Sequence, residues 1–227
     1  MNNVVLTKTY PAPPLCEREI LRYAGSPLAD HETQNLLKQC LSIAEDKFVY
    51  KVCYCRLTVN ILEDICDFGA FKVKSLKLSQ NLKGCENVIV FGATVGVEID
   101  RLIAKYSRIS PAKALMLQAM GTERIEALCD RFCEDIKVSL KTNLKPRFSA
   151  GYGDLPLDTQ KQIFNLLNLP KHIGLSLNDS LIMSPSKSVT AFVGLTDKTE
   201  KTVTNKCDLC DNKDCTFRGA LRISENF

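Results

Sequence analysis

The residue types best suited to chemistry lie together in one segment, residues 147–156, with the sequence RFSAGYGDLP. Arg147 carries a planar guanidinium that can hold a carboxylate or a phosphate through two parallel hydrogen bonds. Tyr152 can cover a flat ligand or donate its hydroxyl. Gly151 and Gly153 allow positive φ angles or a close approach of the backbone. The segment predicts a small-molecule binding loop; the alternative is a tight surface loop with a packed tyrosine.

A second segment with unusual chemistry, residues 180–191, has the sequence SLIMSPSKSVTA. Between residues 122 and 138 lies an acidic helical pattern in which Glu126 and Asp130 are four residues apart. Side chains at this spacing are neighbours on a helix surface, so the two carboxylates repel unless a cation sits nearby. Either this row is a solvated face or one of the two carboxylates faces a ligand.

The third feature is a cysteine pattern near the C-terminus, formed by Cys207, Cys210 and Cys215. A C-x-x-C pair is a common half-site for zinc or an iron–sulfur cluster, but both usually need four protein ligands. Cys16, Cys85 or a second chain could supply the fourth. The alternatives are a zinc site, a redox cluster and free thiols.

The elements that must position these residues are predicted from apolar periodicity. Strands are expected at residues 48–59, 70–74, 87–91, 173–177 and 187–195. Helices are expected at residues 17–24, 31–46, from 97 onward, 111–121, from 122 onward and 159–167. Asp30 and Ser110 are expected N-caps, and Gly121 is expected to separate two helices.

This order of elements predicts an α+β fold with a twisted, mainly antiparallel sheet and flanking helices. Residues 1–84 form its N-terminal helical and strand portion, residues 85–195 its core, and residues 196–227 a polar linker and a cysteine-rich tail. Gly92 and Gly96 follow a predicted strand, which is a feature of dinucleotide-binding turns. Their spacing is not G-x-G-x-x-G, so a tight turn beside the core is the favoured interpretation.

The composition is that of an ordinary soluble protein, with 45% hydrophobic and 25% charged residues among 227. A net charge of +4 without a basic cluster argues against nucleic-acid binding. No apolar run reaches the roughly 20 residues of a membrane helix, and the N-terminus lacks a signal-peptide pattern. We therefore expect a cytoplasmic protein with no nucleic-acid or membrane partner, in which most of the eleven cysteines are buried free thiols.

Segments 147–156 and 180–191 together resemble the activation domain of cobalamin-dependent methionine synthase. That family's pattern is an Arg-x-x-x-Gly-Tyr-Pro/Gly loop, then Ser-x-x-Met-x-Pro-x-x-Ser-Val-Ser-Gly. The resemblance covers roughly residues 85–195, and residues 18–23 resemble the start of stand-alone versions of the domain. It implies that the chain binds S-adenosylmethionine and presents its methyl group to cob(II)alamin on a partner, with one electron from flavodoxin or another reductant. Such a protein needs no nucleophile of its own, because its part is positioning and electrostatics.

The resemblance also implies roles for particular residues. Arg147 would hold the methionine carboxylate, Tyr152 would shape the pocket, and Glu126 or Asp130 would lie near the ammonium or sulfonium. Gly153 stands where the family often has proline, which implies a more mobile loop. The residues that would supply backbone contacts to the ligand are Ser149, Ala150 and Gly151. The residues that would line the wall approached by the corrinoid are Ser184, Pro185 and Ser188.

The implied partner is a cobalamin-binding methionine synthase that lacks its own activation domain. Two alternatives remain open at this point. The chain could be a docking module for a corrinoid protein whose ligand site has decayed, or a metal-dependent redox protein centred on the C-terminal cysteines.

Overall fold

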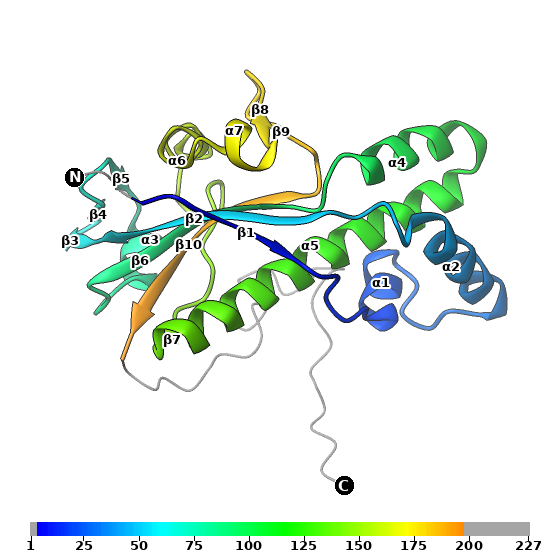
Figure 1. The fold of residues 1–227 in the computed structure, drawn as a ribbon, viewed down its shortest axis with the longest axis horizontal. Helices are drawn as coiled ribbons and strands as arrows, with labels where there is room; N and C mark the ends of the chain where they lie inside the picture. The colour runs from blue at the N-terminus through cyan, green and yellow to red at the C-terminus, as the bar shows by residue number, and fades with distance from the viewer. Residues whose placement is uncertain (1–3, 198–227) are drawn as a thin grey trace, which may run out of the picture.

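This computed structural model describes residues 4–197 and has a five-stranded antiparallel sheet at its centre (Figure 1). The strands lie side by side in the order β1 (Leu6–Tyr10), β2 (Tyr50–Thr58), β6 (Asn87–Thr94), β10 (Ser188–Thr196) and β7 (Asn143–Leu144). All neighbours pair antiparallel. The predicted α+β fold is thereby confirmed, and segments 1–84 and 85–195 contribute strands to the same sheet.

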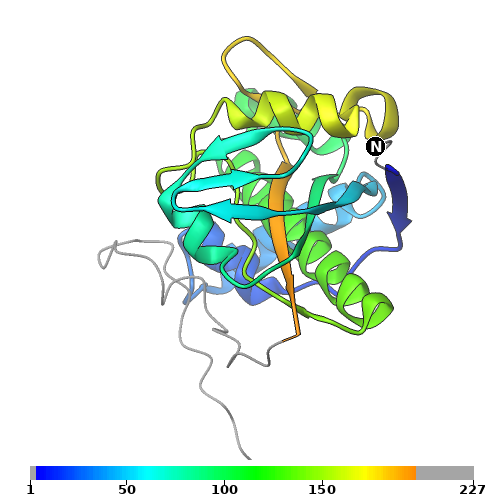
Figure 2. The ribbon, with the colours of Figure 1, turned by 90° about the vertical axis from the view of Figure 1, so that its left-hand side faces the viewer.

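Helices and small sheets cover both faces of the central sheet, as the view from its end shows (Figure 2). On one side lie α1 (Glu17–Tyr23), α2 (His31–Ala44) and α5 (Pro111–Leu140), with α4 (Glu98–Ile109) packed on α5. On the other lie α6 (Thr159–Leu167), α7 (Leu169–Ile173) and α3 (Leu76–Asn81). The small sheets are β3 (Asn60–Leu62), β4 (Ile65–Asp67) and β5 (Lys72–Lys74), and the pair β8 (Ser176–Leu177) and β9 (Met183–Ser184).

The central sheet separates two apolar cores. Successive side chains of a strand point to opposite faces, so Ile89 and Phe91 of β6 pack with α1, α2 and α5. Val88 and Val90, from the same strand, pack with α6 and α7. Both faces of β6 are therefore buried, which explains why its sequence is a continuous apolar run.

Helix α5 is one unbroken element of 30 residues, and the prediction of two helices divided at Gly121 is wrong. Gly121 is buried inside it, and a Cβ there would come within 2.9 Å of Lys187 Cγ. The Thr122 hydroxyl donates to the Gln118 carbonyl one turn earlier instead of capping a new helix. A glycine costs a helix about 1 kcal/mol, which is less than the packing of so long a helix provides.

One further prediction is wrong, and one strand was missed. Residues 173–177 are not one strand: α7 ends at Ile173, Gly174 follows with a φ of 70°, and only Ser176–Leu177 is extended. β1 was not predicted at all. Its side chains alternate only weakly in burial, because it is an edge strand of the sheet.

Glu123 belongs to the acidic row of α5, but it forms a buried ion pair with Arg124. Arg124 also donates to the carbonyls of Pro13 and Pro14 at 2.7 and 2.8 Å, and Glu123 accepts from the Cys16 amide at 3.1 Å. These hydrogen bonds satisfy the backbone of residues 13–16 and so fix the position of the segment that leads into α1.

The cysteines follow the prediction where the structure describes them. Six of the eight cysteines within residues 4–197 are buried, namely Cys40, Cys53, Cys55, Cys66, Cys85 and Cys129. Burial raises the pKa of Cys53 and Cys66 to about 11 and that of Cys55 to about 12. Within residues 4–197, no helix has the length and apolarity needed to cross a membrane.

Gly92 lies inside β6, and its replacement tests why a glycine is needed there. A Cβ at this position would lie 2.7 Å from Leu169 Cδ2, and Leu169 is fully buried. We expect Gly92→Ala to lower the free energy of unfolding by about 1–3 kcal/mol because of overpacking, measured by guanidinium unfolding. In a Leu169→Ala background the same change should cost much less; an equal cost in both backgrounds would show that Leu169 is not the reason.

Candidate functional site

Helix α5 brings the two unusual segments to one surface. Thr122, Glu126 and Asp130 are spaced four residues apart, so they form one stripe along the helix. Lys187, from the second segment, donates to the Thr122 hydroxyl at 3.1 Å. Arg147, from the first segment, contacts Glu126 and Asp130 further along the stripe. Segments 147–156 and 180–191 therefore meet α5 within a few turns of each other.

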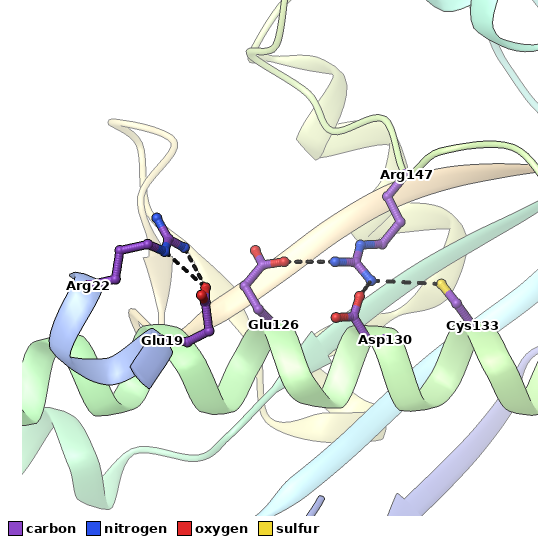
Figure 3. Close-up of polar contacts among 6 residues, drawn as sticks. All are labelled: Glu19, Arg22, Glu126, Asp130, Cys133 and Arg147. Carbon is purple, nitrogen blue, oxygen red and sulfur yellow. Dashed lines mark hydrogen bonds and ion pairs between the residues drawn. The ribbon is translucent and has the colours of Figure 1, made fainter. Parts of the chain in front are cut away.

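The centre of this surface is an ion cluster of Arg147, Glu126 and Asp130 (Figure 3). Arg147 Nη2 donates to Glu126 Oε2 at 2.7 Å, and Nη1 donates to Asp130 Oδ1 at 2.5 Å. Only 9% of the Arg147 side chain is exposed. Burial alone would lower the pKa of Arg147, but Cys129 and the two carboxylates outweigh it and raise that pKa above its ordinary value. Arg147 is therefore the cation that allows two carboxylates one turn apart on α5.

Helix α1 borders the same cluster. Figure 3 shows Arg22 and Glu19 of α1 on one side of Glu126 and Arg147 on the other. Arg22 pairs with Glu19 at 2.7 Å and lies over the Tyr23 ring, 4.2 Å from its centre. Burial and the nearby Glu126 carboxylate raise the pKa of Tyr23. The only sequence signal for these residues was the resemblance in 18–23.

The loop after Arg147 is closed by its own backbone. Gly151 and Gly153 have φ angles of 83° and 61°, so both glycines are required by conformation. The Gly151 amide donates to the Leu155 carbonyl at 3.0 Å, and the Tyr152 amide donates to the Ser149 carbonyl at 3.1 Å. Ser149 and the neighbouring Ala150 are half-buried.

Two aromatic residues connect this loop to the sheet. Phe148 exchanges backbone hydrogen bonds with Phe192 of β10, at 2.9 and 2.8 Å. The Tyr152 ring meets the Phe148 ring edge-on at 5.3 Å, and 48% of Tyr152 is exposed. The Tyr152 ring is therefore about half exposed, whereas Phe148, against which it packs, is buried.

Asp154 of the first segment has a structural role that sequence reasoning missed. Its carboxylate accepts from the Leu76 amide at 2.7 Å, the Lys77 amide at 3.1 Å and the Ser75 hydroxyl at 2.5 Å. These groups form the N-terminus of α3, whose unpaired amides favour a negative charge. The hydrogen bond from Ser75 and those from the two amides lower the pKa of Asp154.

The second segment is held against β6 and α4. The Ser188 hydroxyl donates to the Pro185 carbonyl at 2.8 Å and contacts the Thr94 hydroxyl at 2.9 Å. Ser186 contacts Asp100 through both its amide and its hydroxyl, each at 2.7 Å. Of the three residues expected on the wall, Pro185 and Ser188 are buried and Ser184 is exposed.

No group of three or more side chains suited to a metal ion occurs within the described part of the chain. Cys207, Cys210 and Cys215 lie outside the described residues, so zinc or iron–sulfur binding by them stays a prediction. Glu126 and Asp130, which the resemblance placed near the ammonium or sulfonium of S-adenosylmethionine, both lie in the ion cluster with Arg147.

Asp154→Asn should weaken the attachment of the loop to α3. We expect it to lower the free energy of unfolding by about 1 kcal/mol at pH 7, as for a lost helix cap. Because the folded pKa of Asp154 lies below its ordinary value of 3.8, its contribution is complete above about pH 4 and is lost as the pH falls through the folded pKa. Guanidinium unfolding at pH 7 and at pH 3 should show the gap between the two proteins closing in acid. A gap independent of pH would contradict this role for the charge.

Comparison with known proteins places this geometry in a family. The model of the vitamin B12-dependent methionine synthase activation domain matches residues 78–214. Among solved structures, the chain is similar in fold to the crystal structure of the MetH reactivation domain bound to AdoHcy. The TM-score is 0.64 and the identity 18%, over 87% of this chain and 80% of that one. No curated protein matches the sequence. The resemblance found in residues 147–156 and 180–191 is confirmed: the chain belongs to the family of vitamin B12-dependent methionine synthase activation domains.

Proposed function

We propose that this chain binds S-adenosylmethionine at the Arg147 cluster and supports the reductive methylation of cob(II)alamin on a separate, cobalamin-binding methionine synthase. The observation that carries the proposal is the convergence of segments 147–156 and 180–191 on one stripe of α5, around a buried arginine. Family membership supports it, as does the AdoHcy bound to the similar reactivation domain. The proposed setting is the cytoplasm.

The charges of the cluster suit this ligand. S-adenosylmethionine carries a carboxylate, an ammonium and a sulfonium, so its net charge is positive. Arg147 offers a fork for the carboxylate, whereas Glu126 and Asp130 offer negative charge for the two cationic groups. One guanidinium and two carboxylates leave the cluster with a net negative charge. The ligand and the cluster are therefore complementary in the sign of their net charge.

The protein's contribution to the reaction is positioning. The cobalt of the partner's cobalamin supplies the nucleophile when an electron arrives from flavodoxin or another reductant. The loop of Ser149, Ala150, Gly151, Tyr152 and Gly153 would cover the ligand on one side. Ser184, Pro185 and Ser188 would form the wall that the corrinoid approaches. A site that fixes the donor in this way lowers the entropic part of the barrier to methyl transfer.

A second candidate is a docking module that binds the corrinoid protein without a ligand. The observation in its favour is the pairing of Arg147, because each of its η nitrogens already has a carboxylate partner. An arginine satisfied in this way can serve purely to hold segment 147–156 on α5. Binding measurements separate the two candidates.

Arg147→Ala tests the proposed ligand site. We expect calorimetric titration to show S-adenosylmethionine binding to the unchanged protein and at least about tenfold weaker binding to the variant, equivalent to about 1.4 kcal/mol. The physical reason is the loss of the charge-assisted hydrogen bonds to the ligand carboxylate. Circular dichroism should confirm that the variant is folded at the temperature of the titration.

Arg56→Ala is the matched control, because Arg56 is an exposed arginine of β2 that contacts Asn87 and none of the cluster. It should leave the affinity unchanged. Absence of heat with both S-adenosylmethionine and S-adenosylhomocysteine in the unchanged protein would exclude the proposed site and leave the docking candidate.

The proposed role also predicts a functional effect on a partner. A cobalamin-binding methionine synthase without its own activation domain, inactivated by oxidation, should regain turnover with this chain, S-adenosylmethionine and a reductant. Arg147→Ala should still be retained by the immobilised partner but should restore little turnover. Retention of the chain without any restored turnover by the unchanged protein would favour the docking candidate.

A further inference from the structure

The two carboxylates that hold Arg147 differ in their exposure to solvent. The Glu126 side chain is 34% exposed and the Asp130 side chain is 71% exposed, whereas Arg147 itself is 9% exposed. The guanidinium is therefore set between a sheltered partner at Nη2 and an exposed partner at Nη1. This asymmetry is not needed to hold a loop in place, for which Glu126 alone would serve.

The exposed partner is also the more easily displaced one. A charge pair open to water contributes only about 0–1 kcal/mol, because solvent screens the attraction and the side chain loses freedom. Asp130 additionally lies one turn from Glu126 on α5, so the two carboxylates repel each other. Glu126 can therefore keep the guanidinium oriented while the contact at Nη1 is exchanged.

We infer that Asp130 occupies, in the ligand-free chain, the place on Arg147 that the ligand's carboxylate takes on binding. This inference rests on the proposed function and adds a second role for Asp130, which competes with the ligand's carboxylate while its charge attracts the ligand's cationic groups. A carboxylate arriving at Nη1 replaces a carboxylate of the same charge and shape, so Arg147 changes partner without moving. Asp130 is a positioning residue: it keeps a buried cation paired until the ligand arrives.

Such an exchange has a measurable consequence. Ligand binding must release Asp130 first, so the apparent affinity is the intrinsic affinity multiplied by the fraction of molecules in which Nη1 is free. The penalty applies only to ligands that bring a carboxylate to Nη1. A ligand without that group does not compete with Asp130 and feels only the negative charge of the cluster.

The test is the Asp130→Asn variant titrated calorimetrically with two ligands that both carry a net charge of +1, S-adenosylmethionine and decarboxylated S-adenosylhomocysteine. Because the two ligands have the same net charge, the ratio of their dissociation constants, decarboxylated over carboxylated, removes the general effect of losing the negative charge of Asp130. We expect this ratio to rise about threefold to fivefold in the variant, which is the fold-change equivalent to a solvent-exposed ion pair.

Glu134→Gln is the matched control, because Glu134 is an exposed carboxylate of the same helix. It should leave the ratio at the value of the unchanged protein. Thermal unfolding should confirm that both variants are folded. A ratio that stays constant or falls in Asp130→Asn overturns the exchange while leaving the proposed function intact, provided that S-adenosylmethionine still binds. If the unchanged protein binds neither ligand, the proposed function fails, and the exchange fails with it.

Discussion

The continuity of α5 is the constraint on which the rest of the structure depends. Its buried face, with Leu128 and Phe132, packs on the central sheet, and its polar stripe carries Glu126 and Asp130. One helix thus fixes the position of the site relative to the core. A break at Gly121 would separate this stripe from the first turns of α5, where Met116, Leu117 and Met120 are anchored in the same core. The glycine is tolerated because it lies against the Lys187 stem, where any larger side chain would collide.

The cluster on α5 shows how a structural need and a binding property can share the same groups. Two carboxylates one turn apart are unfavourable, and a buried guanidinium without partners would be more so. Bringing the three together solves both problems and attaches segment 147–156 to the helix. The solution leaves a net negative charge and one exposed partner, Asp130. Under the proposed function, the arrangement that stabilises the ligand-free protein is therefore also the one that a ligand with a carboxylate and an ammonium group would enter.

Local patterns in the sequence predicted the elements well, and pairings between distant residues poorly. The strand at 48–59 and the helices at 31–46 and 159–167 follow from apolar periodicity, and Asp30 caps α2 as expected. The spacing of Glu126 and Asp130 indicated a repulsion that a nearby cation would relieve, but not that Arg147 is such a cation. The sequence analysis did not predict that Asp154 accepts hydrogen bonds at the N-terminus of α3, or that Arg124 donates to the Pro13 carbonyl. Their partners are far apart in the chain, and only the folded topology brings them together.

The family motif itself divides into two kinds of residue once its contacts are known. Gly151 and Gly153 are required by their positive φ angles, Phe148 by its pairing with β10, and Asp154 by the N-terminus of α3. These residues build and hold the loop and need no ligand to explain them. What remains for recognition is the Arg147 fork and the exposed Tyr152. The chain shares the fold of a reactivation domain to which it is 18% identical. Under the proposed function its ligand preference would depend on these few side chains, so that the charge balance around Arg147, more than the motif as a whole, would decide what the site accepts.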